Sequence, residues 1–220
     1  MIPLRDVIPS RTTPYITITI IALNAVAWFY ELTLPAQQLN NFLQTFGVVP
    51  ASFTAPTLIT SMFLHGSWSH ILGNMWYLWI FGDNVEDRFG HGRFVVFYLL
   101  AGIVAALGQM AMDSTSLLPT IGASGAIAGV MGAYFVLYPR SRVHTLIPFF
   151  PFFFEVFEIP AIFLLGFWFL MQLVSAGSIA MTASTNNGGV AFMAHVAGFL
   201  FGVIGVFFFR NRRQEAEYWA

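Results

Sequence analysis

The sequence contains no cysteine, which excludes disulfide bonds, thiolate metal sites and a cysteine nucleophile. It is also poor in charge: only 9% of its 220 residues are Asp, Glu, Lys or Arg, whereas a soluble globular domain carries about 25%. Hydrophobic residues make up 57% of the chain. The composition therefore excludes a soluble enzyme and predicts a polytopic membrane protein, organised as a single domain over residues 1–220.

Long apolar runs predict the secondary structure. A helix needs about 20 apolar residues to cross a bilayer, and six runs approach that length. We therefore expect an all-α fold with six transmembrane helices, of which the fourth is short, central and rich in glycine. The expected spans are residues 14–30, 58–81, 94–112, 121–138, 160–179 and 190–209.

The first outer loop and the N-terminal region need separate interpretation. Residues 31–56 mix Gln and Asn with apolar side chains, which predicts a long interfacial first outer loop with short amphipathic helices. Near the N-terminus, two arginines, an apolar run and the motif AVA at 25–27 also resemble a secretory signal peptide. The apolar run continues unbroken through Tyr30, which favours a retained first span.

The arginines predict the topology, because all nine basic residues are arginines. With six spans, the N-terminus, the loops at 82–93 and 139–159, and the C-terminus share one side, and every arginine falls on that side. The opposite side carries only Glu31 and Asp113 as charges. Positive residues are retained in the cytoplasm, so we expect both termini there.

Polar side chains within membrane spans are costly and are candidates for function. The second span contains His70 and Asn74, the fourth contains Ser124, and the sixth contains His195. These three spans all run from the outer to the inner side, so their depths can be compared by counting to the first inner charge. The intervals are His70 to Asp83, Ser124 to Arg140 and His195 to Arg210.

The counts are 13, 16 and 15 residues, or about 20, 24 and 22 Å of helix. In a hydrocarbon core of about 30 Å, all three levels lie roughly 6–10 Å below the outer surface. The polar residues of three parallel spans are therefore predicted to converge at one depth.

Pairs of glycines predict close packing between the fourth and sixth spans. Gly125 and Gly129 form one small-xxx-small pair, and Gly198 and Gly202 form another. The face that carries Ser124 can then meet the face of the sixth span. The alternative interpretation is that these glycines only pack helices, with the Ser124 hydroxyl bonded to a carbonyl one turn earlier.

These residues fit acyl transfer by a serine nucleophile. A serine hydroxyl needs an adjacent base, which His195 can supply to Ser124. His70 and Asn74, four residues apart on one helix face, can stabilise an oxyanion together with the backbone N–H of Ser124. No carboxylate lies within a span near His195, so a Ser-His-Asp triad is not expected.

Other chemistries are less well supported. GASGA is not the G-x-S-x-G nucleophile elbow, and no H-E-x-x-H motif is present. A metal site built from His65, His70 and His195 lacks a carboxylate, so neither a metal nor a cofactor is expected. A small transporter is a further alternative, but no internal repeat is visible.

The ordered motifs GASG, HILGN and AHVAGFLFG resemble the rhomboid family of intramembrane serine proteases. The resemblance implies Ser124 as nucleophile, His195 as base, and an oxyanion site at His70 and Asn74. It implies cleavage of single-span membrane proteins near the outer end of their helices, with substrates entering past the second and fifth spans. The implied partners are transmembrane substrates and lipid, without nucleic acid, in a bacterial or archaeal plasma membrane.

Two departures from the family pattern stand out. Some relatives carry a tyrosine one turn after the nucleophile that stacks on the catalytic histidine, but this chain has Ala128 there. Phe192 or Phe199 is then a candidate for orienting His195. The Trp-Arg pair that many relatives have in the first outer loop is also absent from residues 31–56.

The resemblance leaves one alternative function open, which is an inactive rhomboid-like protein that binds transmembrane clients. His65 matches a recurrent family histidine and is expected to have a structural rather than a chemical role.

Overall fold

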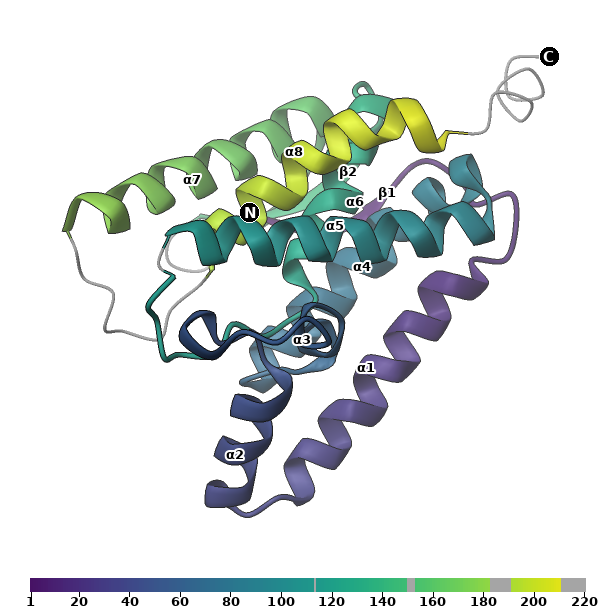
Figure 1. Ribbon diagram of the computed structural model, residues 1–220. Helices are drawn as coiled ribbons and strands as arrows, with labels where there is room; N and C mark the ends of the chain where they lie inside the picture. Colours follow the sequence, from purple (N-terminus) through teal and green to yellow (C-terminus); the bar gives the residue numbers. More distant parts are fainter. Residues whose placement is uncertain (113, 150–152, 183–190, 211–220) are drawn as a thin grey trace.

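A computed structural model of the chain describes residues 1–112, 114–149, 153–182 and 191–210 (Figure 1). Six helices of 14 residues or more dominate these described residues. They are α1 (Tyr15–Thr33), α4 (Trp68–Phe89), α5 (His91–Met112), α6 (Ser124–Leu137), α7 (Ala161–Thr182) and α8 (Phe192–Phe209). Between α1 and α4 the chain forms shorter helices, namely α2 (Ala36–Phe46), η1 (Pro50–Ser52), α3 (Thr57–Thr60) and η2 (Ser61–Phe63).

Within the described residues, four helices are long and apolar enough to cross a membrane. They are α1, α5, α8 and the part of α7 from Ala161 to Ser178. The shorter α6 is also apolar, whereas α4 carries more polar residues and does not reach the same hydropathy.

The second span differs from the predicted residues 58–81. Its first ten residues form α3, η2 and a turn, and α4 begins only at Trp68, where the Ser67 hydroxyl accepts the His70 N–H at 3.2 Å. The helix then continues beyond the predicted end to Phe89. Gly90, with φ of 77°, separates it from α5, so the predicted 82–93 loop is mostly helical. The apolar run does not give the correct ends of this helix, because polar residues near both ends have hydrogen-bond partners within the protein.

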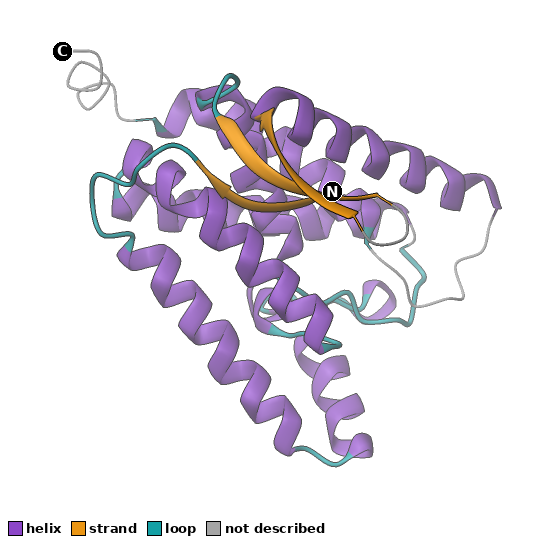
Figure 2. Ribbon diagram, turned by 180° about the vertical axis from the view of Figure 1, so that it is seen from behind, coloured by secondary structure: helices purple, strands orange, loops and turns teal. Residues whose placement is uncertain are grey.

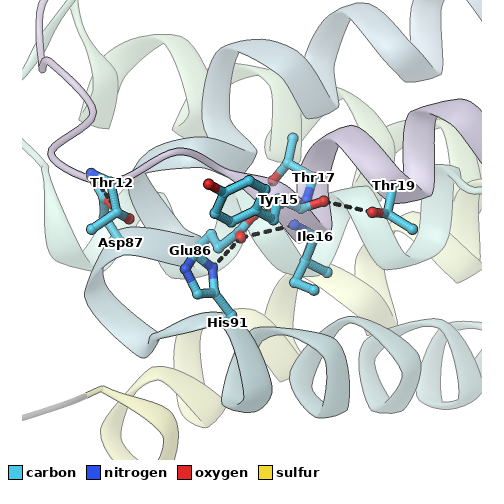
Figure 3. A network of polar contacts seen from close by, with 8 residues as sticks. All are labelled: Thr12, Tyr15, Ile16, Thr17, Thr19, Glu86, Asp87 and His91. Carbon is cyan, nitrogen blue, oxygen red and sulfur yellow. Dashed lines mark hydrogen bonds and ion pairs between the residues drawn. The ribbon is translucent and has the colours of Figure 1, made fainter.

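The C-terminal end of α4 shows how these polar residues are accommodated (Figure 3). The carboxylate of Glu86 is fully buried and accepts the backbone N–H groups of Ile16 and Thr17 at 2.9 and 2.8 Å. It also accepts the Thr17 hydroxyl and contacts His91 Nδ1 at 2.6 Å. Because α1 has no side-chain cap of its own, Glu86 satisfies its free N–H groups and places negative charge at its N-terminus.

A three-stranded antiparallel sheet corrects the all-α prediction (Figure 2). The strands β1 (Ile2–Asp6), β2 (Arg142–Phe149) and β3 (Phe153–Pro160) pair in the order β1-β2-β3. Alternation along β2 leaves Val143 and Thr145 fully buried while Arg142 is exposed. Arg142 pairs with Glu158 of β3 at 2.8 Å, a hydrogen bond that lowers the pKa of the Glu158 carboxyl. The described residues that precede the fifth span, 142–149 and 153–160, are therefore strand and not helix.

Side chains of the helices hold β1 against the bundle. Trp76 of α4 donates its indole N–H to the Pro3 carbonyl at 2.6 Å. Tyr134 of α6 donates its hydroxyl to Asp6 at 2.5 Å. Burial raises the pKa of the Asp6 carboxyl to about 6. The N-terminal strand is thus bonded to both α4 and α6.

The centre of the molecule is α6, whose residues from Gly125 to Tyr134 are all buried. It packs most extensively against α8. A side-chain carbon at Gly198 would come within 2.1 Å of the Gly125 carbonyl oxygen, and one at Gly202 within 1.9 Å of the Gly129 oxygen. On the α5 side, a side-chain carbon at Gly125 would come within 2.5 Å of the Ala105 methyl group, and one at Gly129 within 2.5 Å of the Ala101 methyl group. Only glycine permits this backbone-to-backbone contact, as the small-residue pairs predict.

Candidate active site

The close packing of α6 against α8 brings a serine and a histidine together. Ser124 is the first residue of α6, and His195 lies in the first turn of α8. The Ser124 hydroxyl lies 2.8 Å from His195 Nε2, a hydrogen-bond distance. His195 is buried, with 8% of its surface exposed, whereas Ser124 is half-buried and more accessible. The two residues are 71 positions apart in sequence, so the contact depends entirely on the tertiary fold.

The opposite edge of the His195 ring faces α7. His195 Nδ1 lies 2.8 Å from the side-chain oxygen of Gln172. Trp168, one turn earlier on the same helix, packs against the imidazole with ring centroids 5.7 Å apart. Phe199 instead stacks on Phe169, with centroids 4.6 Å apart. The contacts that orient His195 therefore come from α7 and not from Phe192 or Phe199, the candidates that the sequence suggested.

A second polar group comes from α4 and the segment before it. His70 Nε2 and Asn74 Nδ2 both lie next to Gly122, at 2.6 and 3.7 Å from the position that a side-chain carbon there would occupy. The Asn74 amide also lies 2.9 Å from His65 Nε2. An amide NH₂ has two donors, so this contact leaves one N–H of Asn74 available. His70 and Asn74 thus flank the backbone two residues before Ser124.

His65 anchors this group to α1. It is almost fully buried, and its backbone N–H approaches both carboxylate oxygens of Glu31 at 3.3 Å. Glu31 is itself 1% exposed and belongs to the last turn of α1, not to a solvated outer loop. The arrangement links α1, the turn before α4 and the polar face of α4.

The side chains around Ser124 are mostly small, and some of them are polar. A cavity of about 20 Å³ adjoins Ser124, a volume close to that of one water molecule. Its lining comes mainly from small residues of η2, α5, α6 and α8. As the first residue of α6, Ser124 also presents a backbone N–H without an acceptor inside the helix. Across the described part of the chain, no three His, Cys, Asp or Glu side chains are grouped so that they could hold a metal.

The model of the rhomboid domain family matches residues 53–212, which is well over half of the chain. The chain belongs to the rhomboid family. It is 27% identical to YdcA of Bacillus subtilis over 94% of both chains, and 37% identical to rhomboid protease GluP of the same bacterium over 54% of this chain and 24% of GluP. It is 30% identical to the human presenilin-associated rhomboid-like protein, mitochondrial, over 91% of this chain. This chain spans about half the length of that mitochondrial relative.

Membership in the family, together with the apolar helices, makes the chain a multi-pass integral membrane protein. Its relatives include mitochondrial as well as bacterial proteins.

Three residues of this rhomboid domain were missed by reasoning from the sequence. Gln172 is a polar residue within an apolar span, and the rule that selected His70 and His195 also applies to it. Trp168 is one of several aromatic residues in the fifth span, and nothing in the sequence indicates which of them faces inward. Gly122 is one of several glycines near the start of the fourth span, whereas the structure places it between α4 and α6.

Proposed function

We propose that the chain is an intramembrane serine endopeptidase that works through a Ser124–His195 dyad. The observation that carries this proposal is the 2.8 Å contact between the Ser124 hydroxyl and His195 Nε2. A serine beside glycine in a membrane helix often only packs, but packing does not require a buried imidazole at hydrogen-bond distance. The family relationship supports the same chemistry, because rhomboid proteins are generally proteases of this kind.

In the proposed reaction, His195 Nε2 accepts the proton of Ser124 as its oxygen attacks the peptide carbonyl. The negative charge on the tetrahedral intermediate is stabilised by N–H donors from His70, Asn74 and the Ser124 backbone. His195 then gives the proton to the leaving amine, and an acyl-enzyme remains on Ser124. Water, activated by the same histidine, hydrolyses this ester and restores the serine.

We further propose that the substrates are single-span membrane proteins, cut near the outer face of the membrane. In this arrangement α4 and α6 also cross the bilayer, which gives six crossings with both termini in the cytoplasm. The host membrane is then the plasma membrane of a bacterium or archaeon. The arginine distribution supports this orientation, because the non-arginine side is the side nearest the dyad.

Labelling with a fluorophosphonate probe tests the dyad directly. Wild-type protein in detergent is expected to react at a single serine, while Ser124→Ala removes the nucleophile and His195→Ala removes its base. We expect no labelling of the first variant and a loss of at least about 10³-fold in the second. Mass spectrometry of the labelled peptide identifies the modified residue.

A matched serine variant controls for general damage. Ser178→Ala alters a hydroxyl on α7 that bonds the Val174 carbonyl, six residues along the helix from Gln172, and is expected to label like wild type. Labelling that persists in Ser124→Ala would falsify the nucleophile assignment. An unreactive wild-type protein that still binds transmembrane clients would instead indicate an inactive rhomboid-like protein.

A further inference from the structure

We propose that Gln172 is the positioning residue for His195, the role that a carboxylate fills in a Ser-His-Asp triad. The proposal rests on the proposed function of the dyad, and it concerns how the base is held, not whether it acts. In the structure Gln172 hydrogen-bonds His195 and not Ser124, so it acts through the imidazole.

The two hydrogen bonds of His195 determine which ring nitrogen carries the proton. An amide oxygen can only accept a hydrogen bond, so the 2.8 Å contact with Gln172 requires a proton on Nδ1. A neutral imidazole has one N–H, which leaves Nε2 unprotonated. Nε2 then accepts the Ser124 hydroxyl at 2.8 Å. Gln172 therefore selects the tautomer in which His195 is ready to act as a base.

A neutral amide suits this environment better than a carboxylate would. His195 is buried, and an ionised side chain beside it would have to leave water at a cost of several kcal/mol. An amide costs less to bury and still supplies an acceptor. The amide stabilises the imidazolium less than a carboxylate would, so its main contribution is to fix the orientation and the tautomer of the ring.

The helix that carries Gln172 supplies a second contact to the same ring. Trp168 and Gln172 are four residues apart and share one face of α7. The indole packs against the imidazole at 5.7 Å while the amide holds its Nδ1 edge. Ala128, fully buried on α6, offers no ring for this purpose. The base is thus held by α7, and Phe169 stacked on Phe199 fixes α7 against α8.

Three substitutions separate this role from a general effect on folding. Gln172→Leu keeps the approximate volume and removes the acceptor, whereas Gln172→Glu keeps an acceptor at the same position. Leu173→Ala, at the next and exposed position of α7, controls for disturbance of the helix. Each variant is measured for the rate of fluorophosphonate labelling as a function of pH, for kcat and KM on a transmembrane substrate, and for the ¹⁵N signals of His195.

We expect Gln172→Leu to slow labelling and kcat about 10- to 100-fold with an unchanged KM, because the ring is held incorrectly while substrate contacts remain. Its ¹⁵N spectrum should show a mixture of tautomers in place of the Nδ1–H form. Gln172→Glu should restore much of the rate and move the acidic limb of the pH profile to higher pH, since a carboxylate stabilises the imidazolium. Leu173→Ala should match wild type.

The proposal is overturned if Gln172→Leu labels at the wild-type rate with an unchanged tautomer, or if Leu173→Ala reproduces its defects. These outcomes are distinct from failure of the proposed function. An unlabelled wild-type protein overturns the dyad assignment, yet the ¹⁵N spectra of wild type and Gln172→Leu still decide whether Gln172 holds the imidazole.

Discussion

At Gly122 the backbone adopts φ of +119°, a conformation that residues with a side chain rarely take. Its N–H donates to the Ser61 carbonyl at 2.8 Å, which ties the start of α6 to η2. A side-chain carbon would also lie only 2.6 Å from His70 Nε2. The absence of a side chain therefore allows the polar face of α4 to approach the backbone beside Ser124.

Replacing Gly122 by Ala is expected to damage both the backbone and the proposed oxyanion site. We predict a destabilisation of about 1–3 kcal/mol from the strained φ, and a loss of at least about 10-fold in labelling rate as His70 is displaced. Gly73→Ala is the matched control, since a side-chain carbon at this position of α4 meets nothing within 4 Å. It should keep full activity and gain about 0.5–1 kcal/mol of stability. Equal behaviour of the two variants in thermal unfolding and labelling would contradict this role of Gly122.

Counting residues along parallel spans gives one coordinate, which is depth, and this count predicts one level for Ser124 and His195. In the structure the Ser124 hydroxyl lies 2.8 Å from His195 Nε2. Rotation about the helix axis and lateral position do not follow from such a count. Gln172 and Trp168 were missed because their role depends on which face of α7 meets α8.

Among the elements, α6 and α8 form the tightest pair, and their glycines set the distance between Ser124 and His195. The backbone of α8 contacts the Gly129 and Gly125 carbonyls directly, without intervening side chains. The sequence predicted this packing because small-xxx-small pairs are a local pattern. It did not predict that the N-terminal residues join a sheet, because β1 pairs with β2 across roughly 140 residues, as in Ile2 with Leu146, and no local pattern encodes that distance.

A methyl group between α6 and α8 should separate the dyad. In Gly202→Ala the new carbon would lie 1.9 Å from the Gly129 oxygen, a backbone atom that can move only with its helix. We predict a loss of about 1–3 kcal/mol in stability, as for overpacked cores, and slower labelling of Ser124. Gly177→Ala on α7, where nothing lies within 4 Å, should leave the labelling rate unchanged and gain about 0.5–1 kcal/mol of stability. Thermal unfolding in detergent and the labelling rate check both, and a Gly202→Ala protein that matches wild type would refute the packing argument.

On the scale of the whole molecule, the segments that carry arginine gather at one end. The N-terminal strand pairs with β2, and the backbone N–H groups of Arg11 and Thr12 bond Asp87 near the end of α4. Arg93 at the start of α5 donates to the Arg210 carbonyl at the end of α8. The sequence predicted that these four segments share a side, and the described contacts join them pairwise. We propose that this end faces the cytoplasm, because positive residues are retained there.

Because the chain has no cysteine, single introduced cysteines can report this orientation without background. Val7 and Arg140 are exposed on the arginine side, whereas Gln38 and Ser114 are exposed on the opposite side. In intact bacterial cells, a membrane-impermeant maleimide should label Gln38→Cys and Ser114→Cys, and should reach Val7→Cys and Arg140→Cys only after permeabilisation. The reverse pattern would invert the topology. Disagreement within either pair would require an odd number of crossings between its members, and so would exclude the six-span arrangement.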